Sequence, residues 1–309
     1  MFSISRVSSI AELPAPVAVC CHDAGAANLV AAWVADAPSQ VFRICVEGPA
    51  RKIFSEVAPT CDSCDLGSAL DGAGSLLSGS GWSSTLEHRS RIEARRRGIP
   101  VLAVLDHWVN YRMRFIRQGL ESLPDVLVVT DLEARRIAVD EFGETCPIVV
   151  WHNRYLEREV ARVHAFGRDD GAREPHLLVA LEPVRESWGD YESAPEFRAL
   201  DFLLDHLAAI FPLPGEVSIR LRLHPSEPPR KYDSWIVQCD RPRLELSSTG
   251  SLARDLAWSD VAVGLHSYAL VVALEAGRRA LSYLPPHAPR CALRHERLEH
   301  LSRLIEGSQ

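Results

Sequence analysis

Two segments in the second half of the chain place polar side chains directly after apolar strands. The alternating run 217–223 ends in His224 and a proline, and the proline holds the histidine in an extended exit from the strand. The apolar run 260–263 is followed by a glycine, His266 and Ser267, and then by a helix-like segment. Open α/β sheets bind ligands at the carboxyl ends of their strands, and a helix start suits a phosphate. The two segments therefore predict an anion site, such as a nucleotide phosphate would need.

Two further charged residues extend this predicted site. Arg222 lies on the same face of the predicted strand as His224, because side chains two residues apart share a face. An imidazole can donate a hydrogen bond to phosphate, and an arginine adds positive charge. Glu275 lies two turns along the helix that Ser267 opens, and it either accepts a ribose hydroxyl or is an ordinary helix-end carboxylate. The plainer alternatives for His224 and Ser267 are a turn histidine and a helix N-cap.

The first half carries a candidate general base. His22 and Asp23 follow the apolar strand 17–21, and Gly25 allows a close approach of a ligand. A carboxylate at a strand end can take a proton from an attacking hydroxyl or thiol, although Asp23 could equally cap the next helix. The segment does not match the glycine-rich dinucleotide fingerprint.

Two more polar segments of the first half are candidates for an acceptor site. One is the open loop that contains Trp82 and Ser83 and precedes a helix, and it could also hold a second anion. The other follows the buried strand 99–105 and begins at Asp106, which is the rival candidate for the base. Sugars are commonly held by hydrogen bonds and by an aromatic face. The side chains after Asp106 that could hold a sugar in these ways are His107, Trp108, Asn110 and Arg112.

Strands and helices alternate along both halves of the chain. The predicted strands are 17–21, 41–46, 99–105, 125–129, 147–151, 176–181, 217–223, 260–263 and 279–284, with short ones at 234–237 and 243–246. The predicted helices are 26–35, 50–57, one that begins after 83–85 and ends at 95–97, 132–142, 154–166, 195–211, 251–258, 267–275 and 293–305. The stretch 62–75 is rich in Gly, Ser and Asp and receives no firm assignment.

This alternation predicts the fold class. Continuous apolar strands separated by helices indicate parallel sheets that are covered on both faces. The polar, glycine-containing stretch 167–175 predicts a domain boundary, with one domain at 1–166 and another at 167–309. We therefore expect an α/β chain with two doubly wound Rossmann-like domains facing across a cleft. The C-terminal helix belongs to the second domain or packs back on the first.

The composition excludes several classes of protein. The 309 residues carry a formal net charge of −7, which argues against a protein that coats nucleic acid. The eight cysteines are scattered, and the C-x-x-C at 61–64 has no second ligand pair at zinc-site spacing, so no metal is expected. There is no leader and no apolar run long enough to span a bilayer. The sequence therefore predicts a cytoplasmic protein without a transmembrane segment.

Two doubly wound domains, a His-Pro after a strand of the second and a Ser opening a later helix resemble the GT-B glycosyltransferase superfamily. The resemblance is strongest to its bacterial capsule, sialyl- and glycerophosphate-transferase branches. There, the His and the Ser contact the phosphate of the donor nucleotide, which implies these roles for His224 and Ser267. It also implies a base in the first domain, where Asp23 is the first candidate. A pair of hydroxyl residues is common where this chain has His266 and Ser267.

The resemblance implies an inverting, metal-independent glycosyltransferase. A nucleotide-activated sugar would be the donor, and a hydroxyl or thiol of a surface glycan or small metabolite the acceptor, with no further cofactor. Arg222, His224 and His266, with the amides near Ser267, would neutralise the leaving phosphate. Nothing excludes an oligomer. One alternative is a non-hydrolysing sugar-nucleotide 2-epimerase, which needs no acceptor, and another is a non-catalytic two-domain protein that binds a small anion.

Overall fold

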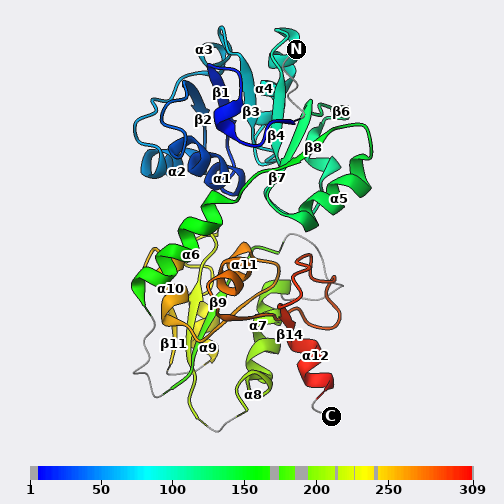
Figure 1. The fold of residues 1–309 in the computed structure, drawn as a ribbon. Coiled ribbons are helices and arrows are strands. Elements are labelled where there is room, and N and C mark those ends of the chain that lie inside the picture. The colour runs from blue at the N-terminus through cyan, green and yellow to red at the C-terminus, as the bar shows by residue number, and fades with distance from the viewer. Residues whose placement is uncertain are drawn as a thin grey trace. The chain divides into compact units, whose positions relative to one another are not determined.

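The chain forms two compact units, each built around its own sheet (Figure 1). The computed structural model describes residues 6–167, 174–184, 194–212, 215–225, 227–239 and 243–307. The units are Met1–Tyr155 and Leu156–Gln309, so the division falls early in α6 rather than at the predicted 166/167. The reason is that the end of α6 packs with the second unit: His164 lies 3.4 Å from the carbonyl of Ala276, and Arg254 lies over the Phe166 ring.

The first unit contains a parallel six-stranded sheet. Its elements are η2 (Ile10–Glu12), β1 (Val17–Cys21), α1 (Ala24–Ala35), β2 (Phe42–Val46), α2 (Pro49–Val57), α3 (Leu66–Leu70), β3 (Ser75–Ser78), α4 (Leu86–Arg96), β4 (Val101–Val104), η3 (Arg112–Phe115), β5 (Ile116–Arg117), β6 (Leu120–Glu121), β7 (Val126–Val129), α5 (Leu132–Phe142), β8 (Ile148–Val150) and the start of α6 (Arg154–Phe166). The sheet order is β2-β1-β3-β4-β7-β8, and β5 and β6 form a separate antiparallel pair.

The order of this sheet reverses between β1 and β3. From β1 the chain goes outward to β2 and then to a parallel bridge between Ile44 and Ser63, and it returns to the other side of β1 as β3. Such a reversal opens a crevice at the carboxyl ends of the two central strands, where doubly wound sheets bind ligands.

Alternation along β1 explains how both faces of this sheet are covered. Val17, Val19 and Cys21 face a core that includes α1 and α2, whereas Ala18 and Cys20 face one that includes α3 and α4. All five are completely buried. A strand buried on both faces loses the alternation of apolar and polar residues, which is why this run is continuously apolar.

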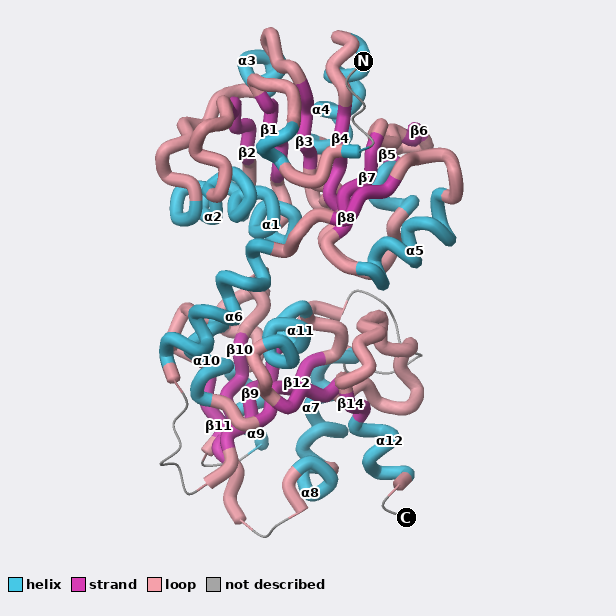
Figure 2. Tube along the Cα trace, viewed as in Figure 1, coloured by secondary structure: helices cyan, strands magenta, loops and turns pink. Residues whose placement is uncertain are grey.

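The second unit repeats the architecture (Figure 2). Its elements are β9 (His176–Ala180), α7 (Pro195–Asp205), α8 (Leu207–Ile210), β10 (Ser218–Arg222), α9 (Asp233–Cys239), β11 (Leu244–Leu246), α10 (Leu252–Trp258), β12 (Val261–Gly264), α11 (Tyr268–Glu275), β13 (Arg279–Ser282), β14 (Glu299–His300) and α12 (Leu301–Glu306). The parallel order is β11-β10-β9-β12-β13-β14, so this sheet reverses between β9 and β12.

The structure confirms the predicted α/β class and corrects some elements. The run 234–237 is part of helix α9 rather than a strand, because Tyr232 and Trp235 pack there into the core of the second unit. The predicted helix 293–305 is reduced to α12, since β14 pairs with β13 and Glu299 bonds Arg279. The helix 195–211 is divided at His206. The stretch 62–75 contains α3 and the start of β3.

The C-terminal helix α12 packs within the second unit. Leu301, Leu304 and Ile305 contact the same core as β9 and β10, and α12 lies against α8. Of the two placements that the sequence left open for this helix, the contacts of α12 agree with the one in the second unit.

Candidate functional site

The carboxylate of Asp23 lies at the reversal point of the first sheet. Its Oδ1 is 2.7 Å from Nδ1 of His22, and its Oδ2 accepts a 3.1 Å hydrogen bond from the backbone N–H of Trp82. His22 and Asp23 follow β1 and Trp82 follows β3, so this contact links the two loops across the crevice. Asp23 is thus held in place by both loops and remains partly exposed.

The loop after β3 fits tightly around this carboxylate. A Cβ atom at Gly81 would lie 2.2 Å from Oδ2 of Asp23, so a larger residue at position 81 would displace the carboxylate. Arg117 donates a 2.7 Å hydrogen bond to the carbonyl of Gly81 and supports the loop from behind. Trp82 is 40% exposed, with the guanidinium of Arg114 5.8 Å from its ring centre.

Asp106, the rival base, forms an ion pair with Arg114. Nη1 of Arg114 donates to Oδ1 of Asp106 at 2.7 Å, and the two side chains are only 8% and 15% exposed, respectively. Oδ2 faces Gly25, where a Cβ atom would lie 1.7 Å away. The position of the Asp106 carboxylate therefore requires a glycine at position 25. The predicted contact of Gly25 with a ligand stays a prediction. Arg114, which sequence reasoning did not select, is the group that neutralises Asp106.

Glu87 of α4 is a further site residue that sequence reasoning did not select. It is completely buried, and its Oε1 accepts a 2.8 Å hydrogen bond from the backbone N–H of His22. Among the described residues, its Oε2 has no hydrogen-bond partner. Burial raises the pKa of Glu87, and the negative charge of Asp23 adds to this effect. In the sequence alone, an acidic residue in the first turn of a helix is explained by the helix dipole, so nothing distinguishes Glu87 as a site residue.

The polar segment after β4 is folded against its own unit. Trp108 is buried, and its indole N–H lies 3.3 Å from Oδ1 of Asp131. This burial does not favour the predicted contact between Trp108 and a sugar. His107 packs edge-on against Trp108, and Arg112 pairs with Glu121.

Two polar residues of the candidate acceptor site lie at the surface. Asn110 is exposed with a φ of +58°, a conformation that asparagine tolerates better than most residues. Ser83 is also exposed. The predicted roles of both residues in acceptor binding stay predictions.

In the second unit, His224 is exposed at the carboxyl end of β10. Its backbone N–H donates to Oε2 of Glu227 at 3.2 Å, and the carbonyl of His224 accepts from the N–H of Glu227. This small closed turn fixes where the strand ends. His224 therefore lies at the edge of the sheet where a phosphate is predicted, and its role in binding one stays a prediction.

Arg222 has a partner inside the protein. It donates a 2.8 Å hydrogen bond to Asp255, which is completely buried and also accepts from Ser247 and Thr249. Arg220 lies 3.5 Å from the same carboxylate. The positive charge of Arg222 is therefore largely balanced by Asp255, and this explains an arginine at that position without a ligand.

The turn between β12 and α11 contains the predicted His266 and Ser267. Ser267 is an N-cap, because its Oγ accepts from the N–H of Ala269 at 3.2 Å. Nδ1 of His266 accepts from the N–H of Ala292 at 3.3 Å, so a neutral His266 carries its ring proton on Nε2. Both residues are partly exposed.

The backbone amides of this turn are not vacant. Glu182, which follows β9 across the reversal point, accepts hydrogen bonds from Leu265 at 2.7 Å and from His266 at 3.0 and 3.1 Å. Burial raises the pKa of Glu182 to about 7, even though three backbone amides including that of Ser267 favour its ionised form. These amides were expected to hold a phosphate, but in the structure the amides of Leu265 and His266 donate to the carboxylate of Glu182.

Glu275 lies at the opposite end of α11 from Ser267. It pairs with Arg297, which also donates to the carbonyl of Leu274, so the pair ties down the end of the helix. The predicted contact of Glu275 with a ribose is untested.

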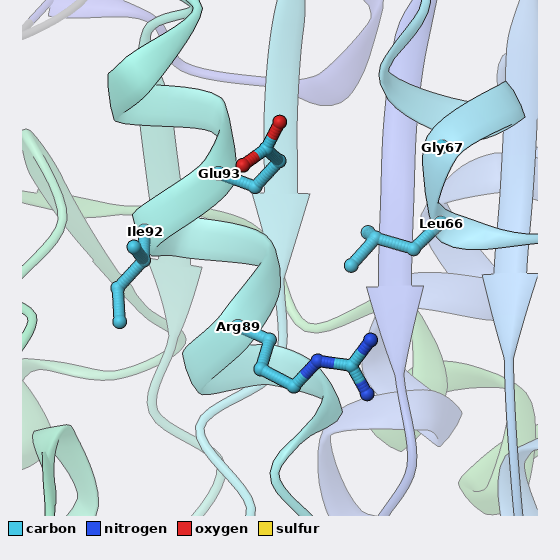
Figure 3. A pocket seen from close by; sticks show the side chains of 5 residues that line it. All are labelled: Leu66, Gly67, Arg89, Ile92 and Glu93. Carbon is cyan, nitrogen blue, oxygen red and sulfur yellow. The ribbon is translucent and has the colours of Figure 1, made fainter.

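A surface pocket among the described residues lies away from these side chains (Figure 3). It lies between α3 and α4, with the side chains of Leu66 and Arg89 directed toward the gap. None of the predicted site residues lines it. In the same described part of the chain, no cluster of His, Cys, Asp and Glu is arranged to hold a metal ion. No described helix is long and apolar enough to cross a membrane.

Comparison with known proteins identifies the fold. The UDP-GlcNAc 2-epimerase from Neisseria meningitidis, solved with UDP-GlcNAc bound, has a TM-score of 0.65 at 12% identity over 94% of this chain and 90% of that one. The Methanocaldococcus jannaschii UDP-GlcNAc 2-epimerase, in complex with UDP-GlcNAc and UDP, gives 0.59 at 9% identity over 94% and 91%. The glycotransferase of kitacinnamycin gives 0.52 at 12% identity over 94% and 89%.

These likenesses show the α/β fold with two parallel six-stranded sheets, as in the Rossmann-like domains of GT-B enzymes. No family model matches the chain. A mannonate dehydratase from Chromohalobacter salexigens is 32% identical over 114 residues, but this chain spans only about a quarter of that protein (26%) and the match covers 33% of this chain.

Proposed function

We propose that this protein cleaves the bond between the anomeric carbon and the diphosphate of a nucleotide-activated sugar and transfers the sugar, with inversion, to a hydroxyl or thiol. The supporting observation is the position of the polar groups. Asp23 lies at the reversal point of one sheet, and His266 and Ser267 lie at that of the other. The relatives of the same fold process or bind UDP-sugars.

The second unit supplies the groups for the donor. His224 follows β10, and His266 and Ser267 follow β12, with β9 between the two strands. Strands lie about 4.8 Å apart, so the two loops leave the sheet about 10 Å from each other. The imidazoles and the Ser267 hydroxyl can donate hydrogen bonds to a diphosphate there. They would stabilise the negative charge on the leaving group in place of a metal ion.

The first unit supplies the base. Asp23 is oriented by the N–H of Trp82 and by Nδ1 of His22, and it would become neutral when it takes the proton of the acceptor. Asp106 is less suited, because its Oδ1 is already bound to Arg114 in a largely buried ion pair. The exposed indole of Trp82, whose backbone N–H donates to Asp23, would bind the acceptor.

Epimerisation at C2 of the sugar is the second candidate. It is favoured by the likeness to two UDP-GlcNAc 2-epimerases and by several carboxylates around one crevice, Asp23, Glu87 and Asp106. That reaction eliminates the nucleotide and adds it back, so it needs groups that remove and return a proton at C2, and no acceptor.

The experiment begins with thermal melting of the protein in the presence of UDP-, GDP-, ADP-, dTDP- and CMP-linked sugars, because a ligand of the folded state raises the melting temperature. Each binder is then incubated in D₂O without an acceptor and followed by NMR. Deuterium at C2 and a new epimer would support the epimerase. Release of nucleotide that depends on an added hydroxyl or thiol compound would support the transferase, and no binding to any member of the panel would contradict both.

Variants then test the assigned residues. We expect His224→Ala to lower kcat/KM about 10- to 100-fold through the loss of a charge-assisted hydrogen bond. The exposed His287 of the same unit provides the matched control as His287→Ala. Asp23→Asn should abolish turnover while the donor still binds, and Asp71→Asn, at an exposed helix end, should not. Equal activity of His224→Ala and its control would remove His224 from the site.

A further inference from the structure

The carboxylate of Glu182 occupies the place that a phosphate takes at a strand-turn-helix site. The backbone N–H groups of Leu265 and His266 converge on it, with Oε1 accepting from both. A Cβ atom at Gly264 would lie 3.4 Å from Oε1 of Glu182, an ordinary contact distance, so the approach does not depend on a glycine there. Amides at such a turn ordinarily serve an external anion. In this protein they are already bound to an internal one.

The same turn carries further hydrogen-bond donors, on the side chains of His266 and Ser267. The Ser267 oxygen accepts from Ala269, which leaves its O–H to donate, and a neutral His266 has its proton on Nε2. A diphosphate bound by His266 and Ser267 would therefore lie next to the carboxylate of Glu182. Two anions at this separation in a partly buried site repel each other strongly.

The surroundings of Glu182 make it able to lose its charge. Three acidic or weakly acidic groups from other segments face it, namely Glu227 after β10, Tyr283 after β13, and Cys291. His266 is the one nearby group in its own turn that can become positive. Lys231 is bound to Glu227 and Glu196 and therefore does not neutralise Glu182 directly. Burial raises the pKa of Glu182 to about 7 before any ligand is present.

We propose that Glu182 is a proton-linked positioning residue of the donor site: it holds the β12–α11 turn in place when the site is empty and takes up a proton when the diphosphate of a nucleotide sugar binds. The inference rests on the proposed function, because it assigns the diphosphate to His266 and Ser267. It adds a consequence that simple phosphate binding lacks, namely that binding weakens as Glu182 ionises.

The first test compares binding of UDP-GlcNAc to the wild type and to Glu182→Gln between pH 6 and 8.5. Both phosphates of this probe are esterified, so the probe itself does not titrate in that range. We expect wild-type affinity to fall about tenfold toward high pH, since a shift of one pKa unit corresponds to a factor of ten. Glu182→Gln should bind more tightly than the wild type at pH 8, and its affinity should vary less above pH 7.

The direction of this change separates the proposal from a purely structural role. Loss of a structural carboxylate would weaken binding at every pH. If only histidines titrated, affinity would fall with pH equally steeply in the wild type and in Glu182→Gln. The variant His224→Gln measures how much of the pH dependence comes from His224. Weaker binding of Glu182→Gln at pH 8, or an unchanged slope above pH 7, would overturn the proposal. Circular dichroism and the melting temperature show whether the variant is folded.

A second measurement needs no variant. The backbone N–H signals of Leu265 and His266 in NMR report the ionisation of the carboxylate to which they donate. We expect them to titrate near pH 7 in the free protein and at a clearly higher pH with saturating UDP-GlcNAc. An unchanged midpoint overturns the inference while binding itself stays intact. If UDP-GlcNAc does not bind, the nucleotide sugar that binds in the melting panel replaces it, and a panel without any binder contradicts the proposed function itself.

Discussion

Gly25→Ala should destabilise the protein, although the same change in an ordinary helix would stabilise it. Gly25 is the second residue of α1, and replacing glycine by alanine inside a helix usually gains up to about 1 kcal/mol. Here the new Cβ atom would lie 1.7 Å from Oδ2 of Asp106, which is about half of an ordinary contact distance. The carboxylate must move, and α1 cannot yield easily because it is packed against the sheet.

The cost follows from the ion pair that this movement breaks. Asp106 and Arg114 are joined at 2.7 Å with side chains that are 15% and 8% exposed. Breaking a buried pair costs about 3–5 kcal/mol, and the helix propensity of alanine offsets about 1 kcal/mol of it. We therefore expect a net loss of about 2–4 kcal/mol, which corresponds to a fall of about 5–10 °C in the melting temperature of this unit.

The assay is a double-mutant cycle with Asp106→Ala, measured by urea unfolding and by thermal melting. When position 106 has no carboxylate, alanine at position 25 meets no obstacle and should be neutral or stabilising. The coupling between the two changes should therefore be about 2 kcal/mol or more. A stabilising effect of Gly25→Ala in the wild type, or an equal cost in both backgrounds, would show that the glycine does not serve Asp106.

Three more outcomes can be checked. Asp255→Ala should cost about 3–5 kcal/mol because two arginines lose a buried partner, whereas Glu245→Ala, at an exposed pair, should cost less than about 1 kcal/mol in urea unfolding. The pKa of Glu182 is about 7 in the folded chain against 4.5 for an ordinary glutamate, so between these pH values the folded chain keeps a proton that the unfolded chain has lost. The free energy of unfolding should therefore fall as pH rises from about 5 to 7.5, by at most about 3 kcal/mol, and Glu182→Gln should flatten that slope in denaturation at several pH values. Gly81→Ala should displace Asp23 and lower kcat about a hundredfold with the fold retained, as turnover and circular dichroism would show.

Most of the fold could be predicted from local patterns, because buried parallel strands are continuous apolar runs. The runs at 17–21 and 261–263 show this directly. Predictions were wrong where tertiary contacts outweigh local preference, as at 234–237, where Trp235 donates to Asp201 of α7 and packs as part of a helix. The strand β3 was missed because it is only four residues long, with two leucines between two serines, too short an apolar run to reveal a central strand.

The candidate site was less predictable, because sequence shows which residues end a strand but not what they contact. Asp23 and Ser267 follow strands, as predicted, and those strands border the two reversal points, which local patterns do not reveal. Arg222 looked like an anion ligand, yet it is bound to Asp255, 33 residues further along the chain. Glu87 and Glu182 were missed for the same reason, since their importance comes from the amides of distant loops.

The two sheets also make the halves separable modules. Every described strand pairs only with strands of its own half. The strands of the first half, β1 to β8, all precede those of the second, β9 to β14, along the chain. A chimaera that joins the first half to the second half of a relative with another nucleotide preference would therefore interrupt no sheet. Under the proposed function, the choice of donor base in such a hybrid should follow the grafted portion, while the choice of acceptor should stay with the original one.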